Sequence, residues 1–176
     1  RVQGCNESDM FIGDTTDRYG RTHNICVVGA GPVGIVVALE LAQRGQEVTL
    51  LESGTFEIEP DVQALSHAIA ADPARNADMT LAVQRRFGGT SNLWGAGCVP
   101  LDPVDFERRA VHDARWPINY AEFARYLPDA CRYAHCGLRF ELPVEGVAIE
   151  DDRFVINRLM RYADPPSFLV AYRDAV

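Results

Sequence analysis

Residues 24–34 of the chain read NICVVGAGPVG, and residues 47–52 read EVTLLE. The first five residues form the continuous apolar run of a strand that is buried on both faces of a parallel sheet. Residues 33–44 follow a glycine-rich turn and predict an apolar helix that stops at Gly45. The second stretch predicts another strand, and Glu52 closes it. This order predicts a βαβ unit and an α/β fold of the Rossmann type.

The turn between the first strand and the helix has the spacing Gly-x-Gly-x-x-Gly, and each glycine has a physical purpose. Gly29 permits the tight turn out of the strand, and Gly31 has no side chain to keep a pyrophosphate from the backbone. Gly34 lets the helix pack close to the strand. The helix that begins near Pro32 offers unpaired N–H groups and a partial positive charge to the phosphates. The turn therefore predicts a dinucleotide site that includes Pro32.

An acidic residue ends the second strand, as expected for such a site. Glu52 lies 18 residues after Gly34, and its carboxylate can accept hydrogen bonds from both ribose hydroxyls of an adenosine. The same charge repels a 2′-phosphate, which argues against NADP. We place the neighbouring Ser53 in the predicted site as well. This motif is compatible with both FAD and NAD.

A second glycine-rich stretch covers residues 85–95 and reads RRFGGTSNLWG. Paired glycines beside small hydroxyl and amide side chains suit the close approach of a second phosphate or of a flavin ring. A NAD-dependent dehydrogenase would normally continue with further βα units instead. The second stretch therefore favours FAD, and a NAD-dependent dehydrogenase stays as the alternative.

Taken together, the two motifs resemble the glucose–methanol–choline family of FAD oxidoreductases. The resemblance is strongest to the branch of pyranose oxidase and related sugar and cyclitol dehydrogenases. Residues 100–107, 116–118 and 165–168 are also similar to that branch. The resemblance implies oxidation of a CH–OH group of an alcohol, sugar or cyclitol, with hydride transfer to the flavin. The electron acceptor stays open among oxygen, a quinone and a cytochrome.

The resemblance also implies which residues hold an extended FAD. The ADP half would contact the first loop and Glu52. The rest of the cofactor would lie along the second loop, where the predicted contacts are Arg86, Gly88, Gly89, Thr90, Asn92, Leu93, Trp94 and Gly95.

Two departures from the family pattern are informative. Leu93 stands where pyranose oxidase has a histidine that binds the flavin covalently, so we expect non-covalent FAD. The family's catalytic histidine lies near the end of a considerably longer chain, and no histidine here has a similar context. We therefore assign no catalytic residue and expect the chain alone to be inactive. A non-catalytic truncated fragment is the remaining alternative. The four histidines are His23, His67, His112 and His135.

We expect three parts in the chain. Residues 1–23 form a leader, residues 24–100 the elements of the FAD-binding core, and residues 101–176 connecting helices with the start of a substrate-domain segment. The C-terminal half of the family fold is absent from this sequence. We predict helices that begin near residue 61, that run from Asn119 to about Cys136, and that follow residues 165–167 to the chain end.

Composition excludes other classes. The chain has 17 basic and 25 acidic residues, a net charge of −8, and no basic face for nucleic acid. No apolar run approaches the ~20 residues of a membrane span. No signal peptide is visible, although the chain begins with Arg1, and we expect a cytoplasmic location. The five cysteines are dispersed, and we predict that Cys131 and Cys136 pack in a helix and bind no metal.

Overall fold

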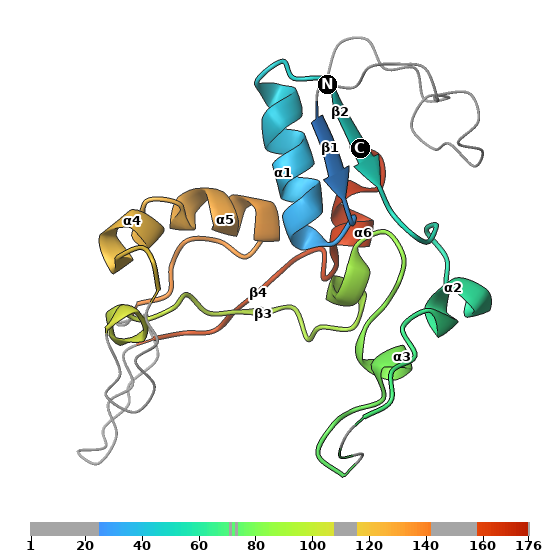
Figure 1. Ribbon diagram of the computed structural model, residues 1–176. Coiled ribbons are helices and arrows are strands. Elements are labelled where there is room, and N and C mark those ends of the chain that lie inside the picture. Colours follow the sequence, from blue (N-terminus) through green and yellow to red (C-terminus); the bar gives the residue numbers. More distant parts are fainter. Residues whose placement is uncertain (1–24, 71, 73, 108–115, 142–157, 176) are drawn as a thin grey trace. The chain divides into compact units, whose positions relative to one another are not determined.

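The computed structural model describes residues 25–70, 72, 74–107, 116–141 and 158–175 (Figure 1). The chain divides into two compact units. One comprises Arg1–Trp94 and Pro166–Val176, and the other comprises Gly95–Pro165. We describe each unit by itself.

The first unit contains the predicted βαβ motif. Strand β1 (Ile25–Val28) pairs in parallel with β2 (Val48–Leu51), and helix α1 (Pro32–Gln43) connects them. Figure 1 shows α1 running alongside the two strands. Proline at the first helical position costs no hydrogen bond, and Gly45 takes a φ of +76° just after the helix ends. Both strands and the helix confirm the sequence prediction.

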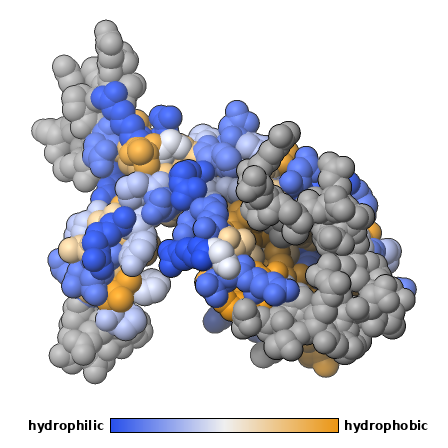
Figure 2. Space-filling view, turned by 90° about the horizontal axis from the view of Figure 1, so that it is seen from above, coloured by the Kyte–Doolittle hydropathy of each residue, from blue (hydrophilic) through white to orange (hydrophobic). Residues whose placement is uncertain are grey.

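Burial of the strands is less complete than the sequence predicts. Helix α1 covers one face of the strand pair, and its residues Ile35 and Ala38 are buried. Val28 is 81% exposed and Leu51 46% exposed. The expectation that the first strand is buried on both faces is therefore wrong for this chain. Both faces of a parallel strand are buried only when other elements pack against each face, and α1 packs against one face of this strand pair. Patches of hydrophobic surface are visible among hydrophilic side chains in Figure 2.

The segment after β2 holds two short helices instead of one long one. Helix α2 (Pro60–Ala64) and helix α3 (Met79–Ala82) are joined through the side chain of Gln63. Its amide nitrogen donates to the carbonyl oxygens of Thr80 and Val83 at 2.7 and 2.8 Å. A side chain that spans 17–20 residues in this way holds an irregular segment in place. The helix predicted from residue 61 is therefore limited to a little over one turn.

The second glycine-rich stretch forms a 3₁₀ helix, η3 (Gly89–Asn92), and packs against helix α6 (Phe168–Tyr172). Phe168 and Tyr172 are buried there, with exposed fractions of 7% and 8%. The predicted final helix exists, but it ends at Tyr172 and does not reach the chain end.

The second unit is built from short elements. Strand β3 (Gly97–Cys98) pairs in antiparallel fashion with β4 (Arg161–Tyr162), and a 3₁₀ helix, η4, spans Pro103–Phe106. Helices α4 (Tyr120–Ala124) and α5 (Leu127–Ala134) follow.

The capping box predicted at the start of α4 is confirmed. Asn119 N–H donates to Glu122 at 2.9 Å, and Glu122 N–H donates to the Asn119 side chain at 3.0 Å. The single helix expected to about Cys136 is interrupted between α4 and α5. Pro128 has no N–H to donate to the preceding turn, so it begins a new helix instead of continuing the first.

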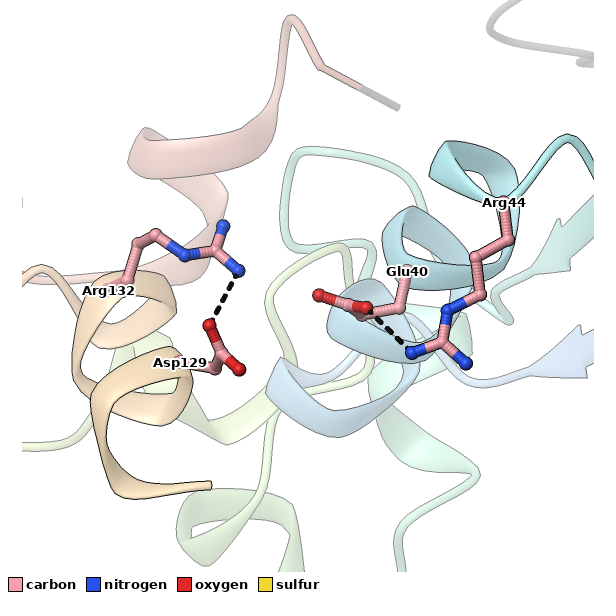
Figure 3. A network of polar contacts seen from close by, with 4 residues as sticks. All are labelled: Glu40, Arg44, Asp129 and Arg132. Atoms are coloured by element: carbon pink, nitrogen blue, oxygen red, sulfur yellow. Dashed lines mark hydrogen bonds and ion pairs between the residues drawn. The ribbon is translucent and has the colours of Figure 1, made fainter. Parts of the chain in front are cut away.

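One exposed ion pair lies at the C-terminal end of α1, and another joins the first and last turns of α5 (Figure 3). In α1, Arg44 lies 3.3 Å from Glu40, four residues earlier. In α5, Arg132 lies 3.2 Å from Asp129, three residues earlier. Exposed pairs of this kind stabilise a helix by only a few tenths of a kcal/mol, so neither determines the fold.

Candidate functional site

The two glycine-rich loops contact each other within the first unit. Gly88 N–H donates to the carbonyl oxygen of Ala30 at 2.7 Å. A Cβ on Gly89 would lie 3.1 Å from the Cα of Gly31, so this contact permits no side chain at Gly89 without displacement. Two motifs that are more than fifty residues apart therefore form one continuous surface of backbone.

The three glycines of the first loop are required for three different reasons. Gly29 has a φ of +98°, which favours glycine, and its N–H donates to Leu51 at 2.7 Å. A Cβ on Gly34 would lie 1.8 Å from the carbonyl oxygen of Gly29, so Gly34 is required for packing. Gly31 has an ordinary φ of −75°, and a Cβ there would meet nothing within 4 Å. Neither the backbone conformation nor the packing requires a glycine at position 31. The glycine is explained instead by the open space beside it, which a side chain would fill.

The N-terminus of α1 faces that space. Its first turn contains no acidic side chain, so the partial positive charge of the helix is not neutralised from within the helix. The first N–H groups of a helix have no partner inside it. The turn from Gly31 to Gly34 can therefore receive an anion such as a diphosphate.

Glu52 connects the end of β2 to the first loop. One carboxylate oxygen, Oε2, accepts a hydrogen bond from Ala30 N–H at 2.7 Å. The other, Oε1, accepts from the N–H and the hydroxyl of Ser53 at 2.8 and 2.9 Å and from Gly54 N–H at 3.4 Å. A carboxylate oxygen has two lone pairs, so Oε2 retains room for one further donor such as a ribose hydroxyl.

A pocket of about 660 Å³ opens at this point, and it lies wholly within the first unit. Its size is in the range of small-molecule sites. Seven predicted residues line it, namely Gly29, Gly31, Pro32, Glu52, Ser53, Gly89 and Thr90. The remaining lining residues were not predicted from the sequence, and they are Val28, Leu51, Ser66, Val83, Gln84 and Arg85.

Other predicted residues brace the second loop and do not line the pocket. The Asn92 amide donates to the carbonyl oxygens of Phe87 and Gly89 at 3.0 and 2.8 Å. Gly88 has a φ of +85°, and a Cβ there would lie 2.7 Å from the backbone nitrogen of Leu169. These contacts set the path of the loop.

The remaining predicted residues lie in different surroundings. The Trp94 indole N–H donates to the carbonyl oxygen of Pro166, and its ring lies 6.4 Å from that of Phe168. Leu93 is 47% exposed, and Gly95 belongs to the second unit. The Arg86 guanidinium donates to the side chain of Gln84 at 2.7 Å and to a backbone carbonyl at 3.4 Å. The predicted flavin contacts of these residues stay predictions.

Ser91 was missed by the sequence analysis although it holds the second loop to α6. It is 5% exposed, its hydroxyl donates to Gly88 at 2.6 Å, and it accepts from the N–H of Phe168 at 3.2 Å. A serine inside a run of small residues gives no sign in the sequence of a partner 77 residues away.

Three of the cysteines form part of the core of the second unit. Cys131, Cys136 and Phe140 are buried together, with Cys98 packed against them. The pKa values of the Cys98 and Cys131 thiols are raised to about 11. Burial is the larger cause, and the neighbouring Cys136 thiol is the second. Such thiols are largely uncharged at neutral pH, which is consistent with the predicted packing role.

The described residues contain no group of three or more His, Cys, Asp or Glu side chains arranged to hold a metal. His67 and His135 are exposed, while His23 and His112 lie outside the described residues. No helix in the described ranges has the length and apolar character needed to cross a membrane.

Comparison with known proteins supports the FAD assignment. A family model described as FAD dependent oxidoreductase matches residues 24–59, which include the first loop and Glu52. FAD is the cofactor. This result resolves the choice between FAD and NAD in favour of FAD.

Three curated relatives are also similar to the chain. The 2-methyl-1,2-propanediol dehydrogenase of Mycolicibacterium austroafricanum is 29% identical over 128 residues, which covers 58% of this chain and 22% of that protein. Two Arabidopsis thaliana proteins, flavin-containing monooxygenases FMO GS-OX-like 5 and 3, are each 30% identical, over 62% of this chain and 24% of their own length. The chain therefore spans about a quarter of these relatives. No solved structure matches it.

The geometry fits the cofactor. The space beside Gly31, which a Cβ would occupy, adjoins the helix N-terminus that favours phosphate and lies in the same pocket as Glu52, which suits a ribose. The βαβ unit matches the family model of FAD dependent oxidoreductases, and the comparisons support a flavin-dependent oxidoreductase without a finer class.

Proposed function

We propose that the protein containing this chain oxidises a CH–OH group of a small alcohol, sugar or cyclitol with FAD as the immediate electron acceptor. The observation that carries the proposal is the contact between Gly89 and Gly31. It joins the segment that resembles sugar-oxidising enzymes of the glucose–methanol–choline family to the dinucleotide loop. The relative named as a propanediol dehydrogenase supports an alcohol as the substrate class.

Residues of this chain would bind and orient the cofactor. The backbone at Gly31 and the N-terminus of α1 hold the diphosphate, and Glu52 holds the ribose while it fixes the loop through Ala30. FAD, when bound, supplies the two-electron chemistry of the reaction. None of the described residues is assigned as the base that takes the hydroxyl proton.

The test is anaerobic reduction of the purified, FAD-loaded protein by a panel of polyols, sugars and cyclitols. We expect substrate-dependent loss of the yellow flavin absorbance with at least one of them. The matched control is the deoxy analogue of that compound, which cannot donate the hydride. Bleaching by none of the alcohols contradicts the proposal.

A monooxygenase is the second candidate because two relatives carry that name. The organic substrate of a monooxygenase does not reduce the flavin, so an external reductant is required. Flavin bleaching by a reduced nicotinamide nucleotide, with oxygen uptake coupled to substrate oxygenation, would favour this class over alcohol oxidation.

A further inference from the structure

The pocket that contains the first loop is also lined by an arginine. Arg85 lines the pocket together with Ser66, Val83 and Gln84. Among the described residues that line it, Arg85 has the only positive charge and Glu52 the only negative one. A FAD-binding pocket has to receive the two negative charges of the cofactor's diphosphate. In the proposed function, the Arg85 guanidinium therefore has an oppositely charged group to bind.

The Arg85 side chain is held in a fixed orientation. Its Nε donates to the hydroxyl of Ser66 at 2.9 Å, and its Nη2 donates to the carbonyl oxygen of Leu65 at 3.5 Å. Ser66 is only 8% exposed, so the hydroxyl that receives Nε lies in a protected position. These two bonds occupy one edge of the planar guanidinium. The hydrogens on Nη1 and the two faces of the group stay available to a ligand.

The Arg85 backbone is also placed firmly. Its N–H donates to the Gln63 side chain at 3.0 Å, and a Cβ on Gly54 would lie 2.1 Å from its carbonyl oxygen. Gly54 lies two residues after Glu52, so Arg85 is anchored at the Glu52 end of the pocket. The Gly88–Gly89 pair, in contrast, is anchored at Ala30 and Gly31.

Arg86 follows Arg85 in the sequence, but its side chain has different hydrogen-bond partners. Its guanidinium is engaged by the side chain of Gln84 and by the carbonyl oxygen of Phe56. Arg86 is also not among the residues that line the pocket.

We propose that Arg85, held by Ser66, is the arginine that binds the ADP half of the cofactor, and that it sets the affinity for adenine nucleotides. The inference rests on the proposed FAD site but not on the identity of the substrate. With Glu52 at the ribose and the N-terminus of α1 at the diphosphate, Arg85 supplies a side-chain cation that no other described residue lining this half-site supplies. A guanidinium can bind phosphate oxygens through Nη1 or stack on the adenine ring, and both lie in the ADP half.

The experiment measures the dissociation constants of ADP and of FAD for the apo form of the full-length protein by titration calorimetry. Arg85→Ala is expected to weaken both ligands by about 10-fold or more, since a charge-assisted contact is lost. Arg75→Ala is the matched control: it removes the same charge in the same unit from a side chain that is 85% exposed and pairs with Asp72. That control should bind both ligands as the wild type does.

Arg85 also holds the chain together at Ser66 and Leu65, so Arg85→Gln is measured as a second variant. Glutamine can still donate to Ser66 but has no charge, and it is expected to show the same weakening with the unfolding temperature of the apo form close to that of the wild type. Unchanged ADP affinity in a folded Arg85→Gln protein overturns the inference. A loss in Arg86→Ala without one in the Arg85 variants also overturns it. Failure of the alcohol assay does not bear on this result, because ADP binding requires no turnover.

Discussion

Glu52 Oε2 lies 2.7 Å from the backbone nitrogen of Ala30, so one carboxylate ties the end of β2 to the first glycine-rich loop. The residue that a dinucleotide motif assigns to the ribose therefore also holds the loop that receives the diphosphate. A single substitution at Glu52 should affect both the cofactor and the fold of its binding loop.

Glu52→Ala is expected to weaken FAD binding by roughly 10- to 150-fold, because a charge-assisted hydrogen bond contributes ~1.5–3 kcal/mol. It should also lower the unfolding temperature of the apo form, since Ala30 N–H loses its acceptor. Titration of apo-protein with FAD and thermal unfolding measure the two effects. Glu57→Ala, at an exposed acid five residues on, is the control. An unchanged FAD affinity would mean that Glu52 is only a loop brace.

Gly31 and Gly34 should respond in opposite ways to a side chain. The Cβ of Gly31→Val meets nothing within 4 Å and the backbone conformation is an allowed one, so the apo form should unfold close to the wild-type temperature while FAD content falls about tenfold or more. Gly34→Ala places a Cβ 1.8 Å from the Gly29 carbonyl oxygen, so its unfolding temperature should fall by roughly 5 °C or more.

Thermal unfolding of the ligand-free variants and flavin content after reconstitution separate the two cases. Normal flavin content in Gly31→Val would refute the assignment of the diphosphate to this glycine. A Gly34→Ala protein as stable as the wild type would refute the packing role instead.

Local signals explain what the sequence predicted well. The βαβ order and the capping box at Asn119 depend on residues within a few positions of one another, and both are present as predicted. The hydrogen bond by which Arg85 reaches Ser66 spans 19 residues, and no periodic pattern in the sequence marks such a bond. The capping box at Asn119 marks only where a helix begins, so the predicted helix was continued past Pro128, where the structure begins a new one.

Ser91→Ala should loosen the second loop from α6. The Ser91 hydroxyl accepts from Phe168 N–H in a buried position, so its loss leaves that N–H without its acceptor, at a cost of about 1–3 kcal/mol. The Gly88 carbonyl oxygen still accepts from the Ser91 backbone N–H. Urea unfolding measures the change. Val170→Ala, on the same helix but 64% exposed, should have little effect. Equal stability of Ser91→Ala and the wild type would show that α6 is held by its aromatic side chains alone.

The thiols of the partly buried Cys98 and the buried Cys131 should be slow to alkylate. With a pKa of about 11 in place of 9.0, the thiolate fraction of Cys98 and Cys131 at pH 8 is about 100-fold lower than that of an ordinary thiol. Iodoacetamide labelling followed by peptide mass spectrometry should therefore modify the exposed Cys26 first. In urea the difference should disappear. Comparable native rates at Cys26 and Cys131 would contradict the buried arrangement.

The same pKa change predicts how stability depends on pH. The folded form holds the two thiol protons more tightly than the unfolded form, whose thiols titrate near 9.0. The stabilisation is therefore complete below pH 9 and is lost as the pH rises from 9 to about 11. Replacing both residues, as in the double variant Cys98→Ala and Cys131→Ala, should flatten this part of the profile in urea unfolding. An unchanged slope would show that other groups cause it.

FAD should leave the denatured protein without the breaking of a covalent bond. The resemblance of the second loop implies that Leu93 stands where pyranose oxidase has its flavin-linking histidine, and a hydrocarbon side chain is no nucleophile. Cys98, five residues on, is a less effective nucleophile because burial raises the pKa of its thiol to about 11 and so keeps it protonated. Acid precipitation of the FAD-loaded protein should leave the yellow colour in the supernatant, whereas a covalently flavinylated protein treated in parallel should keep it in the pellet. A washed pellet that still fluoresces under ultraviolet light would establish a covalent linkage, and the variant Cys98→Ala would then show whether that thiol forms it.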